Sequence, residues 1–215
     1  MRDIHKLIQG SQRFQNKEFK KHRRTFEKLA IQGQAPKVLF IGCCDSRVLP
    51  NLITNTGPGD LFIVRNIGNF VAPYKPDEDF HSTAAAIEYA VTILEVKDII
   101  VCGHSQCGAI GALYTQKKLE NEDLVHVKTW LNLGMPAKEL VEELEPDASK
   151  EDKLTMTEEL SVLFQLENLM TYPTVKERVE KGILALNGWH YDIESGEIAA
   201  FDEEKEAFLP LFTES

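Results

Sequence analysis

Hydrophobic positions recur at helical spacing near the start of the chain and then gather into short continuous runs. Residues 3–31 place apolar side chains among polar ones at mostly helical intervals, which predicts one or two amphipathic helices. After Pro36, apolar runs of strand length follow at 37–43, 61–65 and 98–102. Two of these runs lack polar alternation, as expected of parallel strands covered on both faces. A helix from a Ser82 cap to about Leu94 is predicted before the third strand, which favours βαβ units.

The second half of the chain is predicted to be mostly helical and to close on two strands. Helical patterns lie near 107–118, 122–145, 155–170 and 173–181. Alternating runs at 182–193 and 197–201, joined by a turn at Ser195-Gly196, predict a hairpin at the sheet edge. The expected fold class is α/β, with a mostly parallel central sheet, flanking helices and an N-terminal helical arm. With no repeat or low-complexity linker, 1–215 is interpreted as one domain, divided into arm (1–35), core (36–120) and helical region with edge hairpin (121–215).

Composition and charge exclude several classes of protein. The chain has 215 residues, and its net charge of −10 argues against nonspecific nucleic-acid binding. No stretch approaches the roughly 20 apolar residues of a membrane span, and the polar N-terminus lacks the apolar core of a signal peptide. Four cysteines are too few for a disulfide scaffold, so we expect a cytosolic protein whose thiols are buried, catalytic or metal-bound. The basic run 17–28 is interpreted as the solvated face of the arm.

Two polar loops follow predicted parallel strands, where open α/β sheets bind ligands. The first loop is 42–47 and the second is 103–108. Cys43, His104 and Cys107 offer two thiolates and an imidazole, a set suited to tetrahedral zinc with a fourth position left open. From spacing alone, a second interpretation stays open, in which both cysteines are small buried hydrophobes and His104 is a core histidine.

Four motifs occur in order along the chain, and together they carry a resemblance. They are C-x-D-S-R from Cys43, G-D-x-F-x-x-R-N from Gly59, I-E-Y-A from Ile87 and G-H-S-x-C-G from Gly103. With the final G-W-x-Y, the chain resembles the β-class carbonic anhydrases over roughly residues 1 to 205. The resemblance is closer to the plant-type subclass.

The resemblance implies reversible hydration of carbon dioxide to bicarbonate and a proton, at a zinc ion held by Cys43, His104 and Cys107. In the family pattern, Asp45 orients the zinc-bound hydroxide and Arg47 holds the Asp45 carboxylate away from the metal. In some members this aspartate becomes the fourth zinc ligand in a closed state. A homodimer or homotetramer is also implied, with N-terminal helices that extend over a partner subunit.

Further family positions match with less specificity. The residues that match substrate-pocket positions are Gln34, Phe62, Ile67, Tyr89 and Gly108. Of these, Tyr89 is expected to reach in from a partner subunit. Some members hold inhibitory bicarbonate with Trp, Arg and Tyr. Here Arg65 and Tyr191 match, but Phe40 replaces the tryptophan. We therefore expect that the enzyme lacks the inhibitory site and that its zinc site stays in the open state.

Other functions and another location are also consistent with this sequence. The same ligands would serve a carbon disulfide or carbonyl sulfide hydrolase, a noncatalytic shell-associated homologue, or a thiol hydrolase using Cys107 and His104. Location in a microcompartment such as a carboxysome is an alternative to the free cytosol. Cys44 and Cys102 are expected to be packing residues, and most of the histidines without ligand spacing are expected at the surface: His5, His22, His81, His126 and His190.

Overall fold

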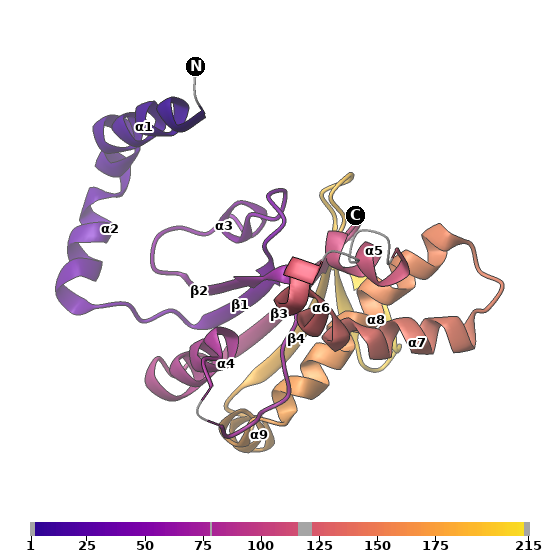
Figure 1. Ribbon diagram of the computed structural model, residues 1–215. Coiled ribbons are helices and arrows are strands. Elements are labelled where there is room, and N and C mark those ends of the chain that lie inside the picture. The colour runs from indigo at the N-terminus through magenta and orange to yellow at the C-terminus, as the bar shows by residue number, and fades with distance from the viewer. Residues whose placement is uncertain (1–2, 78, 116–121, 213–215) are drawn as a thin grey trace.

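A six-stranded sheet forms the centre of the computed structural model, which describes residues 3–77, 79–115 and 122–212. The strand order is β2-β1-β3-β4-β5-β6. The strands span Leu61–Asn66 (β2), Val38–Cys43 (β1), Asp98–His104 (β3), Ala185–Tyr191 (β4), Ile198–Asp202 (β5) and Ala207–Pro210 (β6). The first four strands in this order are mutually parallel, whereas β5 and β6 pair in antiparallel fashion (Figure 1). The α/β class with a mostly parallel sheet is confirmed.

The register brings the carboxyl ends of the parallel strands to one edge of the sheet. Cys43 at the end of β1 pairs with Asn66 of β2, and His104 at the end of β3 pairs with Tyr191 of β4. Since β1 lies between β2 and β3, the loops that leave β1 and β3 start side by side. This edge is therefore where polar side chains from distant segments meet.

Helices cover one face of the sheet and form the larger hydrophobic core. They are α4 (Ser82–Glu88), η3 (Tyr89–Ile93), α8 (Lys150–Met170) and α9 (Pro173–Glu180). Their buried side chains pack on those of β1 and β3 that point to this face, among them Leu39, Ile41, Ile99 and Val101. Each fully buried aliphatic side chain contributes about 1.5 to 3 kcal/mol. The α4 helix begins after His81, which makes no side-chain cap, so the predicted Ser82 cap was wrong.

The helical second half differs from the predicted pattern where proline and capping residues interrupt it. The expected helix 122–145 divides into α6 (Val125–Leu131) and α7 (Met135–Leu144), because Pro136 favours the start of a new helix. The α8 helix starts earlier than predicted, since the Ser149 hydroxyl accepts the Asp152 N–H at 3.1 Å and caps it. The α5 helix (Gly108–Tyr114) follows the second polar loop, and part of its predicted range lies outside the described residues.

The short elements of the described residues that were not predicted include α3 (Pro50–Ile53) and β6. The α3 helix follows the first polar loop, and β6 continues the sheet beyond the expected hairpin. The β4 and β5 strands do form an antiparallel pair, but β6 and not β5 is the outer strand on that side. The predicted β4–β5 hairpin is therefore confirmed, and β6 extends the sheet by one strand beyond it.

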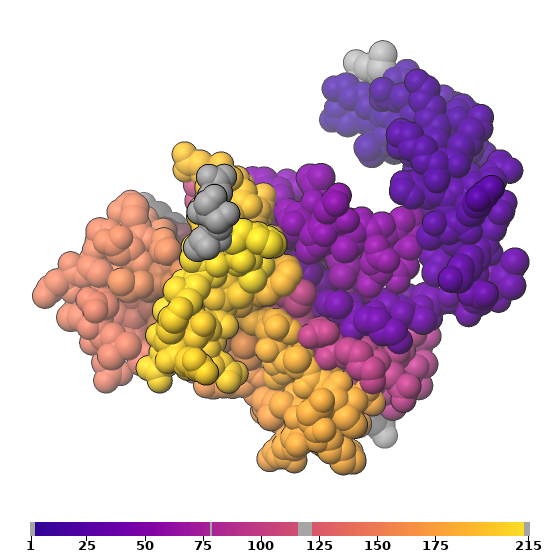
Figure 2. Space-filling model, turned by 180° about the vertical axis from the view of Figure 1, so that it is seen from behind, coloured from indigo at the N-terminus to yellow at the C-terminus, as the bar shows by residue number. Residues whose placement is uncertain are grey.

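An N-terminal arm extends from the body of the molecule. It consists of α1 (Asp3–Arg13), η1 (Phe14–Glu18) and α2 (Phe19–Gln32), none of which contains a buried residue. Figures 1 and 2 show the arm, in indigo, curving away from the sheet with open space between its tip and the body. Among the described residues, no helix is both long and apolar enough to span a membrane.

Candidate metal centre

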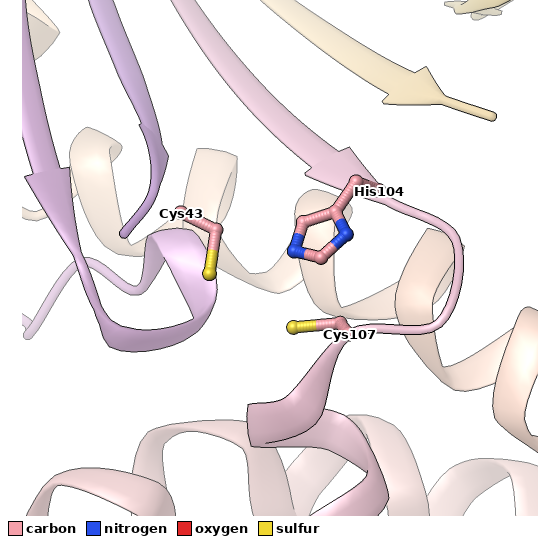
Figure 3. Close-up of side chains that lie close together, drawn as sticks. All are labelled: Cys43, His104 and Cys107. Carbon is pink, nitrogen blue, oxygen red and sulfur yellow. The ribbon is translucent and has the colours of Figure 1, made fainter. Parts of the chain in front are cut away.

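Three side chains from two loops converge at the carboxyl edge of the sheet. Cys43 ends β1, His104 ends β3, and Cys107 directly precedes α5. Their sulfur and nitrogen atoms all lie within 4.8 Å of one another, and Figure 3 shows the three side chains pointing toward a common centre. All three residues are buried. The chain reverses between His104 and Cys107 through Gln106, whose φ of 57° is left-handed.

The imidazole of His104 is oriented as a metal ligand would be. Its Nδ1 lies 2.9 Å from the Ser105 carbonyl oxygen. Because a carbonyl can only accept, Nδ1 carries the proton and Nε2 keeps its lone pair. Nε2 is buried and makes no hydrogen bond among the described residues. A buried acceptor beside two thiols is satisfied by a cation that all three share.

The two thiols favour the same conclusion. Hydrogen bonding from Cys107 lowers the pKa of Cys43 to about 4, and the same contact raises the pKa of Cys107. The first thiolate therefore forms readily, but its negative charge opposes the second ionisation. A divalent cation would remove that opposition, so the donor set fits a soft metal such as zinc.

Backbone N–H groups also stabilise the Cys43 thiolate. The amides of Asp45 and Gly68 each donate to Cys43 Sγ at 3.4 Å. Gly68 has a φ of 76°, and a Cβ atom there would lie 2.8 Å from Phe70 and 2.9 Å from Ala109. Only glycine satisfies both the left-handed backbone and the lack of space.

The carboxylate of Asp45 is held by Arg47. Arg47 donates from Nε to Asp45 Oδ1 at 2.9 Å and from Nη2 to Oδ2 at 2.8 Å, and its backbone N–H also donates to Oδ1 at 2.9 Å. These hydrogen bonds hold the pKa of Asp45 well below its usual range. Asp45 does not belong to the group of converging ligand atoms among the described residues.

Arg47 also joins the two loops through a residue that the sequence analysis missed. It donates from Nη2 to the Gln106 carbonyl at 3.1 Å and from Nη1 to Gln106 Oε1 at 3.3 Å. Gln106 thereby connects the turn before Cys107 to the side chain that holds Asp45. Its only signal in the sequence is its place inside the second polar loop.

The residues matched to the substrate pocket lie in different surroundings. Phe62 and Tyr89 stack with ring centroids 5.9 Å apart, and Tyr89 is 46% exposed. Ile67 is also exposed, and its carbonyl accepts the Trp130 Nε1–H at 2.7 Å. Gln34 lies exposed between α2 and β1, and Gly108 begins α5. A pocket role for these residues stays a prediction, as does the approach of Tyr89 from a partner subunit.

Two of the three residues matched to the inhibitory bicarbonate site, Phe40 and Arg65, make other contacts. Phe40 is fully buried and packs edge-on against Trp189, with centroids 6.4 Å apart. Arg65 donates to the backbone carbonyls of Cys43, at 3.0 Å, and Asp45, at 2.7 Å. Phe40 has no hydrogen-bond donor with which to replace a tryptophan N–H.

The remaining cysteines and one histidine differ in burial. Cys102 is fully buried, and burial raises its pKa to about 12, in keeping with a packing role. Cys44 is exposed, so the expected packed thiol was wrong at this position. Adjacent residues of an extended chain point to opposite sides, so a buried Cys43 turns Cys44 outward. His190 is buried in β4 and not at the surface.

The fold and this site define an α/β protein with a candidate metal centre at the carboxyl ends of parallel strands. Residues 38–198 match the family model described as carbonic anhydrase. A carbonic anhydrase of Pseudomonas aeruginosa is 44% identical over 98% of this chain and 92% of its own length.

Solved structures of β-carbonic anhydrases are also similar to this chain. The β-carbonic anhydrase CcaA is 41% identical, with a TM-score of 0.91 over 98% of this chain and 93% of that one. One of two tetrameric β-carbonic anhydrases from the fungus Sordaria macrospora is 31% identical, with a TM-score of 0.80 over 93% of this chain and 97% of that one. The chain belongs to the carbonic anhydrase family, in its β class, and is an enzyme of this class.

Proposed function

We propose that this protein binds Zn²⁺ through Cys43, His104 and Cys107 and catalyses the reversible hydration of carbon dioxide to bicarbonate and a proton. The observation that carries the proposal is the convergence of two thiols and an unpartnered imidazole nitrogen in one buried group. The zinc ion, when bound, supplies a Lewis acid that lowers the pKa of water toward neutrality. Three protein ligands would leave a fourth position for substrate water.

Asp45 is proposed to orient the attacking water. As an anion it can accept a hydrogen bond from the oxygen that attacks carbon dioxide, which directs a lone pair of that oxygen toward the substrate carbon. The fork of Arg47 fixes the direction of the carboxylate and keeps its pKa low, so Asp45 stays ionised at neutral pH. Arg47 therefore acts by positioning Asp45.

The proposed substrate side of the site is suited to a small uncharged molecule. Phe62, Ile67 and Tyr89 present apolar or aromatic surface, as expected of a pocket for carbon dioxide, which has no charge to bind. The Gly108 amide, beside Cys107, and the Gln34 amide are proposed to contact the substrate.

Zinc analysis combined with stopped-flow carbon dioxide hydration tests the function. We expect one zinc per chain and hydration that disappears when a chelator removes the metal. Sulfide release from carbon disulfide or carbonyl sulfide without hydration would instead identify the hydrolase alternative. A fully zinc-loaded protein without either activity would identify a noncatalytic homologue, and rapid alkylation of Cys107 in the loaded protein would favour a thiol hydrolase.

A homo-oligomer, at least a dimer, is proposed from the surface of the arm. Residues 1–35 contain nine basic and three acidic side chains, whereas the remainder has 15 basic and 31 acidic ones. The arm also exposes apolar side chains, notably Ile4, Leu7, Ile8 and Ile31. A basic arm with exposed apolar residues complements the acidic body of a second copy. The tetrameric Sordaria enzymes support further assembly.

We also propose where the protein is located and how the chain is organised into domains. All four cysteines are free thiols, which supports a reducing compartment, and we propose the cytoplasm, with a microcompartment as the alternative. We also propose that residues 1–215 act as one domain, because the arm is expected to function only when docked on a second copy.

A further inference from the structure

A buried carboxylate lies directly behind the candidate metal centre, on a helix that the family motifs do not include. Glu158 of α8 is only 4% exposed. Its Oε1 accepts the backbone N–H of Cys107 at 2.8 Å, across 51 positions of sequence. Since Cys107 immediately precedes α5 and makes no side-chain cap, this bond anchors the end of the second polar loop.

The second oxygen of the same carboxylate faces a buried histidine. Glu158 Oε2 lies 3.6 Å from Nε2 of His190, which is 8% exposed. His190 pairs in the sheet with Gly103, the residue before His104. Its ring also packs edge-on against Phe208, with centroids 6.4 Å apart. The Glu158 carboxylate therefore lies between the backbone of Cys107 and the side chain of His190, which stands on the strand next to His104.

Close packing of α8 on β3 makes this contact possible. A Cβ atom at Gly103 would lie 2.7 Å from the Val162 side chain and 3.4 Å from the backbone oxygen of Glu158. Gly103 therefore allows α8 to approach the strand closely enough for Glu158 to reach Cys107.

Burying a carboxylate against the backbone of Cys107 is unfavourable without compensation, because the ionised group loses its hydration. One backbone N–H and one imidazole face the carboxylate. A packing role alone would be served better by an apolar side chain of the same size. A divalent cation held by the two thiolates would cancel their charge and so favour the carboxylate in this place.

We propose that Glu158 is a positioning residue of the metal centre. Its carboxylate fixes the backbone of Cys107 through the 2.8 Å hydrogen bond, and hence the direction of the Cys107 sulfur, while its second oxygen faces His190 Nε2 at 3.6 Å. The proposal rests on the zinc site assigned above. Groups that orient metal ligands in this way typically change metal affinity or activity about 10-fold to 100-fold when removed.

The test compares Glu158→Met with Glu158→Gln. Methionine keeps a similar volume without an oxygen acceptor, whereas glutamine retains an oxygen for the Cys107 N–H. Zinc release from the loaded protein to a chromogenic chelator is measured, together with the thiolate-to-metal absorption of the Cd²⁺ form and the thermal unfolding midpoint of each. Glu167→Gln, which alters an exposed carboxylate of the same helix, is the matched control.

The proposal predicts zinc release about 10-fold to 100-fold faster in Glu158→Met, with a shifted Cd²⁺ absorption band. Glu158→Gln is predicted to recover most of this loss, and Glu167→Gln to match the parent. If Glu158→Met does not fold, His190→Phe is measured, for which release several-fold faster than the parent is expected. Parental release and absorption in the folded Glu158→Met, or failing that in His190→Phe, would overturn the proposal.

Measurements on the parent protein distinguish a failure of this proposal from a failure of the proposed function on which it rests. A parent without the Cd²⁺-thiolate band would overturn the metal centre and the role of Glu158 together. A parent that binds the metal but does not hydrate carbon dioxide would overturn the catalytic assignment alone, and faster release in Glu158→Met would still support the positioning role.

Discussion

Cys43 and Cys107 are both small buried residues, and so is Cys102, but their surroundings differ. Cys102 lies within β3, is surrounded by apolar side chains and holds its proton tightly. Cys43 and Cys107 lie at the end of β1 and the start of α5, where backbone amides and an imidazole reach them. A residue's place at the end of an element thus separates a candidate ligand from a packing residue.

Removing either thiol of the centre should remove the metal. We expect Cys43→Ala and Cys107→Ala to lose zinc and hydration activity together, because two remaining ligands hold the metal far less tightly than three. Metal content by elemental mass spectrometry and stopped-flow hydration measure the two losses. Cys102→Ala is the matched control and should retain both, at a stability cost of about 1 kcal/mol for the small cavity.

Replacing Asp45 should separate zinc binding from turnover. Asp45→Asn is expected to keep the metal but to lose hydration activity by roughly 100-fold or more, since the charge that holds Arg47 and accepts the hydrogen bond is gone. Asp77→Asn is a control, because Asp77 also pairs with a cation, Lys75, but lies on an exposed loop. Full activity in Asp45→Asn would contradict the orienting role.

Gly68 gives a prediction for stability. Gly68→Ala should destabilise the protein by about 1 to 3 kcal/mol, because its φ of 76° and the contacts with Phe70 and Ala109 oppose a side chain. In Gly111→Ala the new Cβ meets nothing within 4 Å and stands in α5, so stability should stay equal or rise slightly. Chemical denaturation of both variants measures the difference, and equal stabilities would refute the argument from strain.

At the scale of elements, the apolar runs of strand length and the helical periodicities predict the parallel strands, the β4–β5 hairpin and the helices that cover the sheet. The α3 helix and β6 are too short for periodicity to identify them. Loops that leave adjacent parallel strands must lie together, so the grouping of Cys43 with His104 followed from topology. Glu158 could not be found in this way, because a glutamate on an amphipathic helix looks solvent-exposed until its buried partner, 51 residues away, is known.

The role proposed for the arm depends on a second copy of the chain. Leu7→Asp combined with Ile8→Asp should shift the protein toward monomers, because both side chains are exposed and are expected to be buried by the partner. Analytical ultracentrifugation measures the assembly state. Gln12→Asp alters a polar exposed position of the same helix and should leave assembly unchanged. An unchanged assembly in the double variant would exclude this face of the arm from the interface.

At the scale of the whole molecule, the pH response depends on whether Asp45 stays with Arg47. The hydrogen bonds from Arg47 lower the pKa of Asp45 in the folded protein, so the stabilisation is fully present above the ordinary carboxyl pKa. It is lost only as the pH falls through the lowered value, well below neutrality. Neutral pH should therefore not release Asp45 from Arg47.

Hydration activity should accordingly decline gradually below about pH 8, as expected when a single ionisation controls the rate. The sequence-based prediction is that Phe40, at the position of a tryptophan, removes a donor that an inhibitory bicarbonate would need in a closed state. Stopped-flow rates across this range, with and without added bicarbonate, measure the response. A steep cooperative loss of activity over one pH unit, together with Asp45 bound to zinc in a crystal grown at the lower pH, would show that the enzyme closes. If the parent instead declines gradually, Phe40→Trp should steepen its pH profile when Phe40 alone prevents closure, and should leave the profile unchanged when the hydrogen bonds from Arg47 to Asp45 suffice.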